Sequence, residues 1–373
     1  MGVYEELGVK RYINAWGPMT ILGGSRMRPE VLAAMVEAGQ AFVDLNDLQR
    51  KAGQRIADLI GVEACYISGG AAAGLAIATA ACVAGTDKAK IARLPDTTGM
   101  KNEVIVQRLH RNMYDHAVRQ IGVKLVEIGT GGGAQPWELE AAIALNTAFV
   151  FYVYASWTRK RPLSLTETVR VAHLHGLPVV VDAAAETPPF SNLRGLSETG
   201  ADLVVFSGGK GIMGPQSTGL VLGRKDLVAA CIPNAAPNHS ICRSMKVSKE
   251  DMAGIVRAVE LYVALDHQAV SRRWAEQVDT VVRALQGIPG VQAERIDASY
   301  SEGIPVARIT LDAQKAGRST ADATAALAAG EPGIRVGEYG DALSINPQFL
   351  EPGEEQIVAK RLREVLTSPA SLA

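Results

Sequence analysis

A lysine and an aspartate stand close to the ends of two predicted strands, where together they can do chemistry. Asp182 directly follows the run PVVV, and Lys210 lies in the segment SGGKGIMGPQSTG, four residues past Phe206. The interval between them leaves room for one loop, one short helix and one strand. Such a pair meets the demands of pyridoxal phosphate, because the lysine can form a Schiff base while the carboxylate keeps the pyridine nitrogen protonated. The alternatives are a solvated loop lysine and a helix-capping aspartate.

Glycines flank Lys210 on both sides, which a solvated lysine does not require. Flexible backbone costs conformational entropy, so a functional reason is favoured. We interpret the glycines at the predicted strand ends as letting the backbone come close to a cofactor. They are Gly69, Gly70, Gly208, Gly209, Gly211 and Gly214.

Small residues between a strand and an alanine-rich helix form a candidate phosphate site. The segment is Ser68-Gly69-Gly70-Ala71-Ala72, and backbone N–H groups at a helix N-terminus bind phosphate. Ser207 can add a hydroxyl. The alternative is an ordinary tight turn, which also favours small residues.

One histidine is the candidate for stacking on the cofactor ring. His110 lies in the loop QRLHRNMYDHA, which follows the strand ending at Gln107, and an aromatic ring there can cover the face of a bound ring. The alternative is an exposed loop histidine.

Basic residues cluster once, in ICRSMKVSKED, as Arg243, Lys246 and Lys249. Arg243 and Lys246 are candidates for binding an anionic group of the substrate, a carboxylate or a phosphate. The alternative is a solvated helix start. Arg335, in the strand GIRVGEYG, is a second candidate for binding a carboxylate, and a salt-bridged surface arginine is its alternative.

Two glycine-rich motifs resemble nucleotide-binding motifs, but each lacks a residue that such a motif requires. The segment 129–134 fits G-x-G-x-x-A, but the next strand carries no acid at its end to hold a ribose, so a flexible linker is favoured. GGKGIMG is no P-loop, because Gly211 rather than serine or threonine follows the lysine. The spacing of His173 and His175 puts them on different helix faces, and no metal site is predicted.

The elements that must position these residues alternate between strand and helix. Short β-branched runs predict strands at 63–68, 103–107, 124–128, 148–154, 178–182, 202–207 and 218–223. Continuous apolar strands separated by helices indicate a mostly parallel sheet buried on both faces. Ligands bind beyond the carboxyl ends of such strands. We therefore expect the site in the loops after Ser68, Gln107, Asp182 and Ser207.

A long helical stretch over 249–287 precedes a smaller α+β pattern. We place a domain boundary inside it, near Leu265. The expected organisation is an N-terminal arm and helix over 1–44, a large cofactor-binding domain over 45–265 and a small C-terminal domain over 266–373.

Composition excludes several classes of protein. The 38 Lys+Arg balance 39 Asp+Glu, which gives no support to a nucleic-acid or anionic-membrane partner. The four cysteines form no CxxC pair, so neither a disulfide framework nor a zinc site is indicated. The acids of MGVYEELGVK do not fit a secretory signal, and no apolar stretch is long enough to cross a bilayer. We expect a reduced, cytoplasmic protein.

Taken together, these segments resemble a known family. The chain is similar to the fold-type-I pyridoxal-phosphate enzymes related to bacterial selenocysteine synthase (seryl-tRNA selenium transferase), in the branch that includes D-glucosaminate-6-phosphate ammonia-lyase. The resemblance runs from RYINAWGPMTILGG through VVVDAAAE, VVFSGGKGIMGPQSTGLVLG and RSMKVSKED to INPQFLEPGEEQIV. It implies the aspartate-aminotransferase-like fold: an α/β large domain with a mostly parallel sheet, plus a small α+β domain.

The resemblance also implies roles for the candidate residues. Lys210 would be the Schiff-base lysine and Asp182 the pyridinium partner, and 68–72 with Ser207 would form the phosphate cup. His110 would be the ring-stacking histidine. Because the family usually places each active site at a dimer interface, a homodimer or larger assembly is implied.

These residues predict a pyridoxal-phosphate-dependent lyase. We expect α,β-elimination from a small β-hydroxy or sugar amino acid, giving a 2-oxo acid and ammonia. The chain begins almost at the motif INAWG, without the N-terminal extension with which selenocysteine synthase holds tRNA, and its charge is balanced, so tRNA binding is not expected. The alternatives are a racemase or epimerase, a selenium-transferase-like enzyme lacking that extension, and a non-catalytic binding protein that keeps the fold.

Overall fold

The computed structural model describes residues 2–156, 158, 163–297 and 303–368, and it divides the chain into two compact units. One unit comprises residues 27–264. The other joins residues 1–26 to residues 265–373. Each unit is described by itself.

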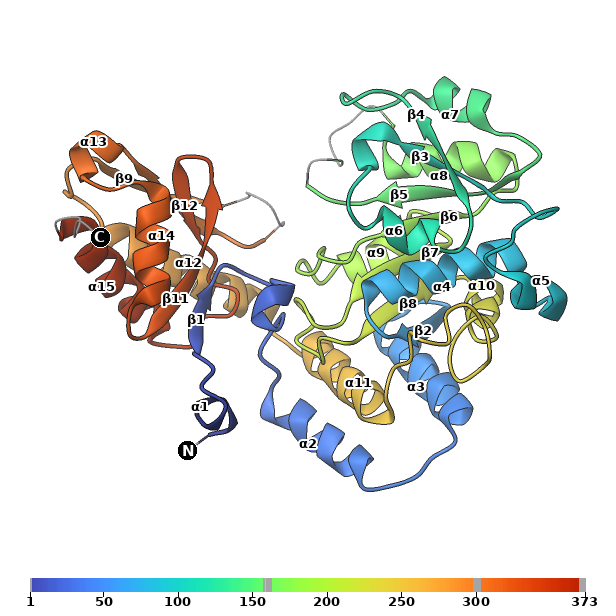
Figure 1. The fold of residues 1–373 in the computed structure, drawn as a ribbon, viewed down its shortest axis with the longest axis horizontal. Helices are drawn as coiled ribbons and strands as arrows, with labels where there is room; N and C mark the ends of the chain where they lie inside the picture. Colours follow the sequence, from blue (N-terminus) through green and yellow to red (C-terminus); the bar gives the residue numbers. More distant parts are fainter. Residues whose placement is uncertain (1, 157, 159–162, 298–302, 369–373) are drawn as a thin grey trace. The chain divides into compact units, whose positions relative to one another are not determined.

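The larger unit is built on a seven-stranded sheet in the order β2-β8-β7-β6-β5-β3-β4 (Figure 1). Its strands are β2 (Ala64–Ser68), β3 (Glu103–Gln107), β4 (Lys124–Ile128), β5 (Thr147–Val153), β6 (Val179–Asp182), β7 (Leu203–Ser207) and β8 (Gly219–Gly223). Neighbours from β4 to β7 pair in parallel, and β8 runs antiparallel to both β7 and β2. The mostly parallel sheet is therefore confirmed. Strand β2 runs in the same direction as β7, so the carboxyl ends of β2, β3, β6 and β7 share one edge.

Both faces of this sheet are buried because the strands are continuously apolar. Val104, Val106 and Phe149 pack into one core cluster with the residues of α4. The intervening Ile105 and Val150 are equally buried on the other face. This pattern is the one expected of a parallel sheet covered on both sides.

Helices and loops of the larger unit surround this sheet (Figure 1). They are α2 (Pro29–Gly39), α3 (Leu45–Ile60), α4 (Ala71–Ala84), α5 (Lys88–Arg93), η2 (Arg108–His110), α6 (Asp115–Arg119), α7 (Pro136–Ala142), α8 (Leu165–Leu174), α9 (Asn192–Glu198), α10 (Lys225–Cys231) and α11 (Lys249–Val263). Helix α4 packs on β2 and on β5 to β8, whereas α8 packs on β5 and β6. The alanines of α4 allow this close approach, since small side chains bring the helix axis near the strands.

The smaller unit holds a five-stranded sheet in the order β1-β11-β12-β10-β9. Its elements are α1 (Val3–Glu6), β1 (Tyr12–Ala15), η1 (Thr20–Leu22), α12 (His267–Ala284), β9 (Val291–Ile296), β10 (Val306–Leu311), α13 (Ala313–Ala316), α14 (Thr320–Ala329), β11 (Gly333–Tyr339), β12 (Ala342–Ile345) and α15 (Glu354–Thr367). Strand β1 pairs in parallel with β11, with Tyr12 opposite Gly333.

The N-terminal residues do not form the separate arm expected over 1–44. Residues 1–26 belong to the smaller unit, together with the C-terminal part of the chain, because their strand β1 pairs with β11. Residues 27–44 belong to the larger unit, where α2 packs on α11. Local sequence does not reveal this division, since the pairing joins segments from opposite ends of the chain.

The long helical stretch expected over 249–287 is two helices. Helix α11 ends at Val263 and α12 begins at His267, where the Asp266 carboxylate caps it by accepting a hydrogen bond from the Ala269 N–H at 2.9 Å. The division between the two units falls between Ala264 and Leu265. Within the described ranges, no helix combines the length and apolarity needed to cross a membrane.

A buried carboxylate joins β6, β7 and β8 at the sheet edge opposite the predicted site. Asp202 is 2% exposed and precedes β7. Its carboxylate accepts hydrogen bonds from the Val179 N–H at 2.7 Å and from Arg224 Nη1 at 2.8 Å, and it contacts His173 Nε2 at 2.9 Å. The carboxylate is fully paired by these partners, and removing its charge would leave them without an ion-pair partner.

We predict that Asp202→Asn lowers the free energy of unfolding by about 2–4 kcal/mol, because a buried charged group loses its ion pair. Urea denaturation followed by circular dichroism measures it. Asp226→Asn removes an exposed carboxylate from the same arginine and is the matched control, expected to cost less than about 1 kcal/mol. Equal losses in the two variants would contradict the assignment.

Candidate active site

Asp182 ends β6 inside the protein. It pairs with Val153 of β5 on one side and with Val205 of β7 on the other, and it is 7% exposed. Its Oδ1 accepts a hydrogen bond from the Ala184 N–H at 3.0 Å. Burial raises the pKa of the carboxyl group, against the opposing effects of this hydrogen bond and of the Lys210 charge.

Lys210 lies in the loop that leaves β7 and returns to β8. The Gly208 N–H donates to the Thr218 carbonyl and the Gly214 N–H donates to the Gly208 carbonyl, each at 2.8 Å, so the loop is closed on itself. Lys210 is half-buried. Burial lowers the pKa of its ammonium group, and the negative charges of Asp182 and then Glu186 oppose that shift. The structure thus brings the predicted lysine and aspartate into one electrostatic site.

The glycines around Lys210 have a different reason from the one we expected. A Cβ added at Gly208 would lie 2.1 Å from Thr218 Oγ1, one at Gly209 would lie 2.4 Å from the Gln216 Cα, and one at Gly211 would lie 2.0 Å from the Thr187 carbonyl oxygen. A Cβ at Gly214 would lie 2.6 Å from Ile255 of α11. Close packing of the protein on itself therefore requires these four glycines. Gly70 is open instead, with no atom within 4 Å of an added Cβ and a φ of +109°.

The segment after β2 leads directly into the N-terminus of α4. Gly70 caps α4, whose first hydrogen bond within the helix runs from the Gly74 N–H to the Gly70 carbonyl at 2.9 Å. Gly69, Gly70 and Ala71 are half-buried and Ala72 is exposed. The amides of the first turn of a helix have no acceptor within the helix, and the helix dipole favours an anion beside them.

The two serines predicted for the phosphate cup differ in their surroundings. Ser68 is 1% exposed and its hydroxyl donates to the Gly70 carbonyl at 2.9 Å, so it holds the turn in place. Ser207 is half-buried, and its hydroxyl has no partner among the residues that the structure describes. Ser207 is thus the better placed of the two for donating to a ligand.

His110 is held deep in the larger unit. It is 1% exposed, its Nδ1 accepts a hydrogen bond from the Val153 N–H at 3.2 Å, and its ring meets that of Tyr152 edge-on at 4.4 Å between centroids. Burial lowers its pKa to about 4. The ring is therefore neutral at pH 7 and carries its proton on Nε2, which lacks a partner within the described ranges. Stacking on a cofactor stays a prediction, because this packing leaves little of the ring exposed.

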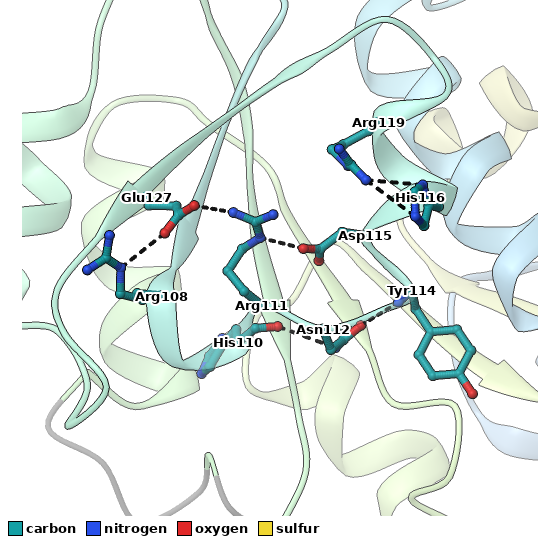
Figure 2. Close-up of polar contacts among 9 residues, drawn as sticks. All are labelled: Arg108, His110, Arg111, Asn112, Tyr114, Asp115, His116, Arg119 and Glu127. Carbon is teal, nitrogen blue, oxygen red and sulfur yellow. Dashed lines mark hydrogen bonds and ion pairs between the residues drawn. The ribbon is translucent and has the colours of Figure 1, made fainter.

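An ion-pair network fixes the loop that carries His110 (Figure 2). Arg111 reaches both the buried Asp115 carboxylate and Glu127 of β4, and Arg108 Nε contacts the same Glu127 carboxylate at 3.2 Å. Hydrogen bonding to Asp115 raises the pKa of Arg111. Sequence patterns missed this network, since it depends on the pairing of β3 with β4.

The predicted substrate-binding cations lie in different surroundings. Arg243 and Lys246 are exposed, and the backbone carbonyls of Met245 and Lys246 lie 3.0 Å and 3.2 Å from the Cβ position of Gly69. This loop thus borders the turn before α4. Lys249 is structural, because its ammonium donates to the Ala38 carbonyl at the end of α2 at 2.7 Å.

Arg335 lies in the other unit, on β11. Its guanidinium carbon sits 4.6 Å from the centroid of the Tyr12 ring, a cation–π contact that joins β11 to β1. Its Nε is buried and has no hydrogen-bond partner among the described residues. Carboxylate binding by Arg335 stays a prediction.

One acidic residue at this edge was missed from the sequence. Glu186 is 5% exposed and its charge acts on Lys210. The sequence does contain a hint of it, because VVVDAAAE places an acid four residues after Asp182, with only alanines between them.

Comparison with known proteins places the chain in a family. The family model described as L-seryl-tRNA selenium transferase matches residues 19–285. A D-glucosaminate-6-phosphate ammonia lyase from Salmonella typhimurium is 38% identical over 97% of each chain. A 5'-C-glycyluridine monooxygenase-decarboxylase from a Streptomyces species is 35% identical over 97% of this chain and 92% of its own.

Solved structures agree with these sequence matches. A structure of D-glucosaminate-6-phosphate ammonia-lyase superposes with a TM-score of 0.86 at 37% identity, covering 98% of both chains. A serine palmitoyltransferase from S. paucimobilis with bound PLP shares the fold, at 15% identity and a TM-score of 0.60 over 95% of this chain and 87% of that one. The α/β fold of the fold-type-I pyridoxal-phosphate enzymes is thus confirmed. The chain belongs to the L-seryl-tRNA selenium transferase family, and the resemblance read from its sequence is confirmed.

Burial of Asp182 has a consequence for stability. A carboxyl group whose pKa is raised on folding adds stability only at low pH and loses it as the pH rises through the folded-state pKa. We predict that Asp182→Asn makes the cofactor-free protein more stable than wild type at pH 7–8, with the difference vanishing below the unfolded-state pKa of 3.8. Urea denaturation between pH 3.5 and pH 8 measures it. A variant less stable at pH 8 than the wild-type protein would contradict the sign.

Proposed function

We propose that the protein is a pyridoxal-phosphate-dependent lyase that eliminates ammonia from a sugar amino acid or another small β-hydroxy amino acid. One observation carries the proposal: a buried aspartate and a half-buried lysine of lowered pKa share the carboxyl edge of the sheet with the open N-terminus of α4. Full-length similarity to an enzyme named D-glucosaminate-6-phosphate ammonia lyase supports the reaction class.

The residues present fit the cofactor. The free amides at the start of α4 and the Ser207 hydroxyl suit its phosphate, Asp182 suits the pyridine nitrogen and Lys210 suits the aldehyde. Space for a ligand exists at Gly70, where no atom lies within 4 Å of an added Cβ. When bound, the cofactor supplies an electron sink that stabilises negative charge at the substrate Cα.

The side chains of this chain then have separable roles. The lowered pKa of Lys210 favours its neutral amine, which can take the proton from the substrate Cα at its Nζ. Asp182 holds negative charge next to the pyridine nitrogen and keeps that nitrogen protonated. Loss of the β-hydroxyl as water leaves an enamine, and hydrolysis of the enamine gives the 2-oxo acid and ammonia.

We predict that the purified protein with pyridoxal phosphate releases equal amounts of ammonia and 2-oxo acid from D-glucosaminate-6-phosphate. Lys210→Ala should reduce kcat at least about 100-fold, as expected for loss of a positioned base. It should also lose the visible absorption of the lysine-linked cofactor. Lys225→Ala, an exposed lysine on α10, is the control.

Other outcomes of this assay would point to other reactions. Deuterium entering Cα from solvent without ammonia release would indicate a racemase or epimerase. Oxygen consumption with carbon dioxide release would indicate the reaction named for the Streptomyces relative. Lys210→Ala with full activity would overturn the proposed function.

The exposed cations next to the cofactor turn suggest an anionic substrate. Arg243 and Lys246 are exposed, and the loop between them touches the Gly69 turn. Guanidinium and ammonium groups bind phosphate by charge-assisted hydrogen bonds. We assign them to the phosphate or carboxylate of the substrate, and Arg335 to a carboxylate.

We predict that Arg243→Ala and Lys246→Ala each raise KM for D-glucosaminate-6-phosphate about tenfold, because a charge-assisted hydrogen bond contributes about 1.5–3 kcal/mol. KM for unphosphorylated D-glucosaminate should change less than about twofold. Steady-state kinetics on both substrates measure the difference, with the exposed Lys88→Ala as control. Equal changes for the two substrates would place the cations elsewhere.

The assembly and location follow from the same proposal. A homodimer or higher homo-oligomer is supported by apolar side chains left exposed on and after α2, among them Leu32 at 46%, Val36 at 64% and Phe42 at 102%. The balanced charge supports a small-molecule substrate over nucleic acid. Four free cysteines suit the reducing cytoplasm, the location we propose.

A further inference from the structure

The five-stranded sheet of the smaller unit has two unlike faces. Ile309 of β10 and Leu343 of β12 are fully buried in a core cluster with residues of α12, α14 and α15. Because successive side chains of a strand point to opposite faces of its sheet, the neighbouring Arg308 and Ser344 project from the other face. These two residues stand directly opposite each other in the pairing of β10 with β12. A guanidinium and a hydroxyl are therefore neighbours on the face away from the core cluster.

This face holds a pocket with a volume of about 330 Å³. Side chains of β9, β10 and the β11–β12 hairpin line it, among them Ile296, Val306, Arg308, Tyr339, Ala342 and Ser344. Apart from the guanidinium and the hydroxyls, the wall is aliphatic or aromatic. The volume lies within the range of small-molecule sites, which are mostly apolar and carry a few placed polar groups.

A glycine next to the pocket leaves room for its aromatic wall. Gly337 of β11 stands opposite Ser344 in the pairing of β11 with β12. A Cβ at this position would lie 3.2 Å from Cε2 of Tyr339 and 3.4 Å from Cβ of Ser344. The missing side chain thus lets the Tyr339 ring lie over β11 at the side of the pocket, where it can contact an apolar ligand.

Arg308 brings an unpaired positive charge to the pocket. Its guanidinium forms no hydrogen bond or ion pair with any residue that the structure describes, although Glu294 of β9 stands opposite it in the strand pairing. The neighbouring Arg295 is paired, by contrast, since its Nη1 donates to the Asp279 carboxylate at 2.8 Å. A guanidinium presents a planar set of donors that matches a carboxylate in a bidentate pair. The pocket therefore carries a donor group suited to an anion.

We propose that this pocket is a second ligand-binding site, which takes a small organic carboxylate with an apolar body. Arg308 binds the carboxylate, the Ser344 hydroxyl donates a further hydrogen bond, and the aliphatic and aromatic wall contacts the apolar body. The lining residues belong to the smaller unit, whereas Lys210 and Asp182 belong to the larger one. The proposal therefore does not depend on the proposed function.

The charge of the pocket favours a carboxylate over a phosphate. A phosphate monoester carries a charge of about −1.5 to −2 at pH 7, whereas a carboxylate carries a single negative charge. Arg308 is the cation that lines the pocket among the described residues, and Glu294 stands opposite it on the neighbouring strand. One positive charge balances a carboxylate and leaves a phosphate monoester with excess negative charge beside an acid.

The test uses the full-length protein with 3-phenylpropionate as the probe, and isothermal titration calorimetry measures its binding. We expect a Kd of about 1 mM, as is usual for so small a ligand. Arg308→Gln should weaken binding about tenfold, because the charge-assisted hydrogen bonds are lost. Arg308→Lys keeps the charge but not the planar donors, and it should weaken binding about threefold. Arg273→Gln, at an exposed arginine of α12, is the control and should match wild type.

A photoreactive carboxylate locates the site. After irradiation of the protein with 4-benzoylbenzoate, mass spectrometry should find the label in peptides that contain β10 (Val306–Leu311) or β12 (Ala342–Ile345). Arg308→Gln should reduce this labelling, and an excess of 3-phenylpropionate should suppress it in the wild-type protein. The uncharged 3-phenylpropanol should suppress it less, because it offers no carboxylate to Arg308.

Three results would overturn the site. They are no measurable binding of 3-phenylpropionate, equal affinity of wild type and Arg308→Gln, and labelling confined to peptides of the larger unit, residues 27–264. If Arg308→Gln does not fold by circular dichroism, Arg308→Lys and Ser344→Ala decide the question. Weaker binding in both then supports the site, and unchanged binding in either overturns it.

Discussion

The parallel pairing of β6 with β7 is the constraint on which the site depends. It places Asp182 opposite Val205, and the hydrogen bond from the Ala183 N–H to the Val205 carbonyl carries the pairing past the strand ends. The lysine loop and the acidic loop are then buried together. Burial shifts the pKa of Asp182 upward and that of Lys210 downward, so burial opposes the charge on each group. A cofactor with a cationic ring nitrogen and an aldehyde would provide a partner for each: the nitrogen for Asp182 and the aldehyde for Lys210.

The buried carboxylates at the two edges of the sheet differ in how many partners they have. At the amino edge, Asp202 has a backbone N–H, an arginine and a histidine as partners, so removing its carboxylate would leave these groups unpaired. At the carboxyl edge, Asp182 has one backbone donor and its burial opposes ionisation. The carboxyl edge, where we expect a ligand to bind, therefore contributes less to folding stability, as is common at functional sites. Relatives named for ammonia elimination and for oxygen-dependent decarboxylation match nearly the whole chain, so this framework serves more than one reaction.

Sequence reasoning predicted the strand ends that carry the candidate residues but misread why some of these residues are there. Four predicted strands end in the structure where the sequence placed their ends, at Ser68, Gln107, Asp182 and Ser207. Their continuously apolar segments were predictable because such segments form strands buried on both faces of a sheet. The glycines around Lys210 belong to the packing of the loop rather than to a ligand, and the Ser68 hydroxyl holds the turn. Such contacts come from segments distant in sequence and leave no local signature.

Local patterns and motifs were enough to predict the alternation of strands and helices, the order of the candidate residues along the chain and the family. Three-dimensional packing was needed to show that β1 pairs with β11 and that a network around Arg111 holds the His110 loop. Each of these joins elements whose separation along the chain is set by topology. A carboxylate's neighbours, and hence its charge, are fixed by packing, which a linear pattern does not record.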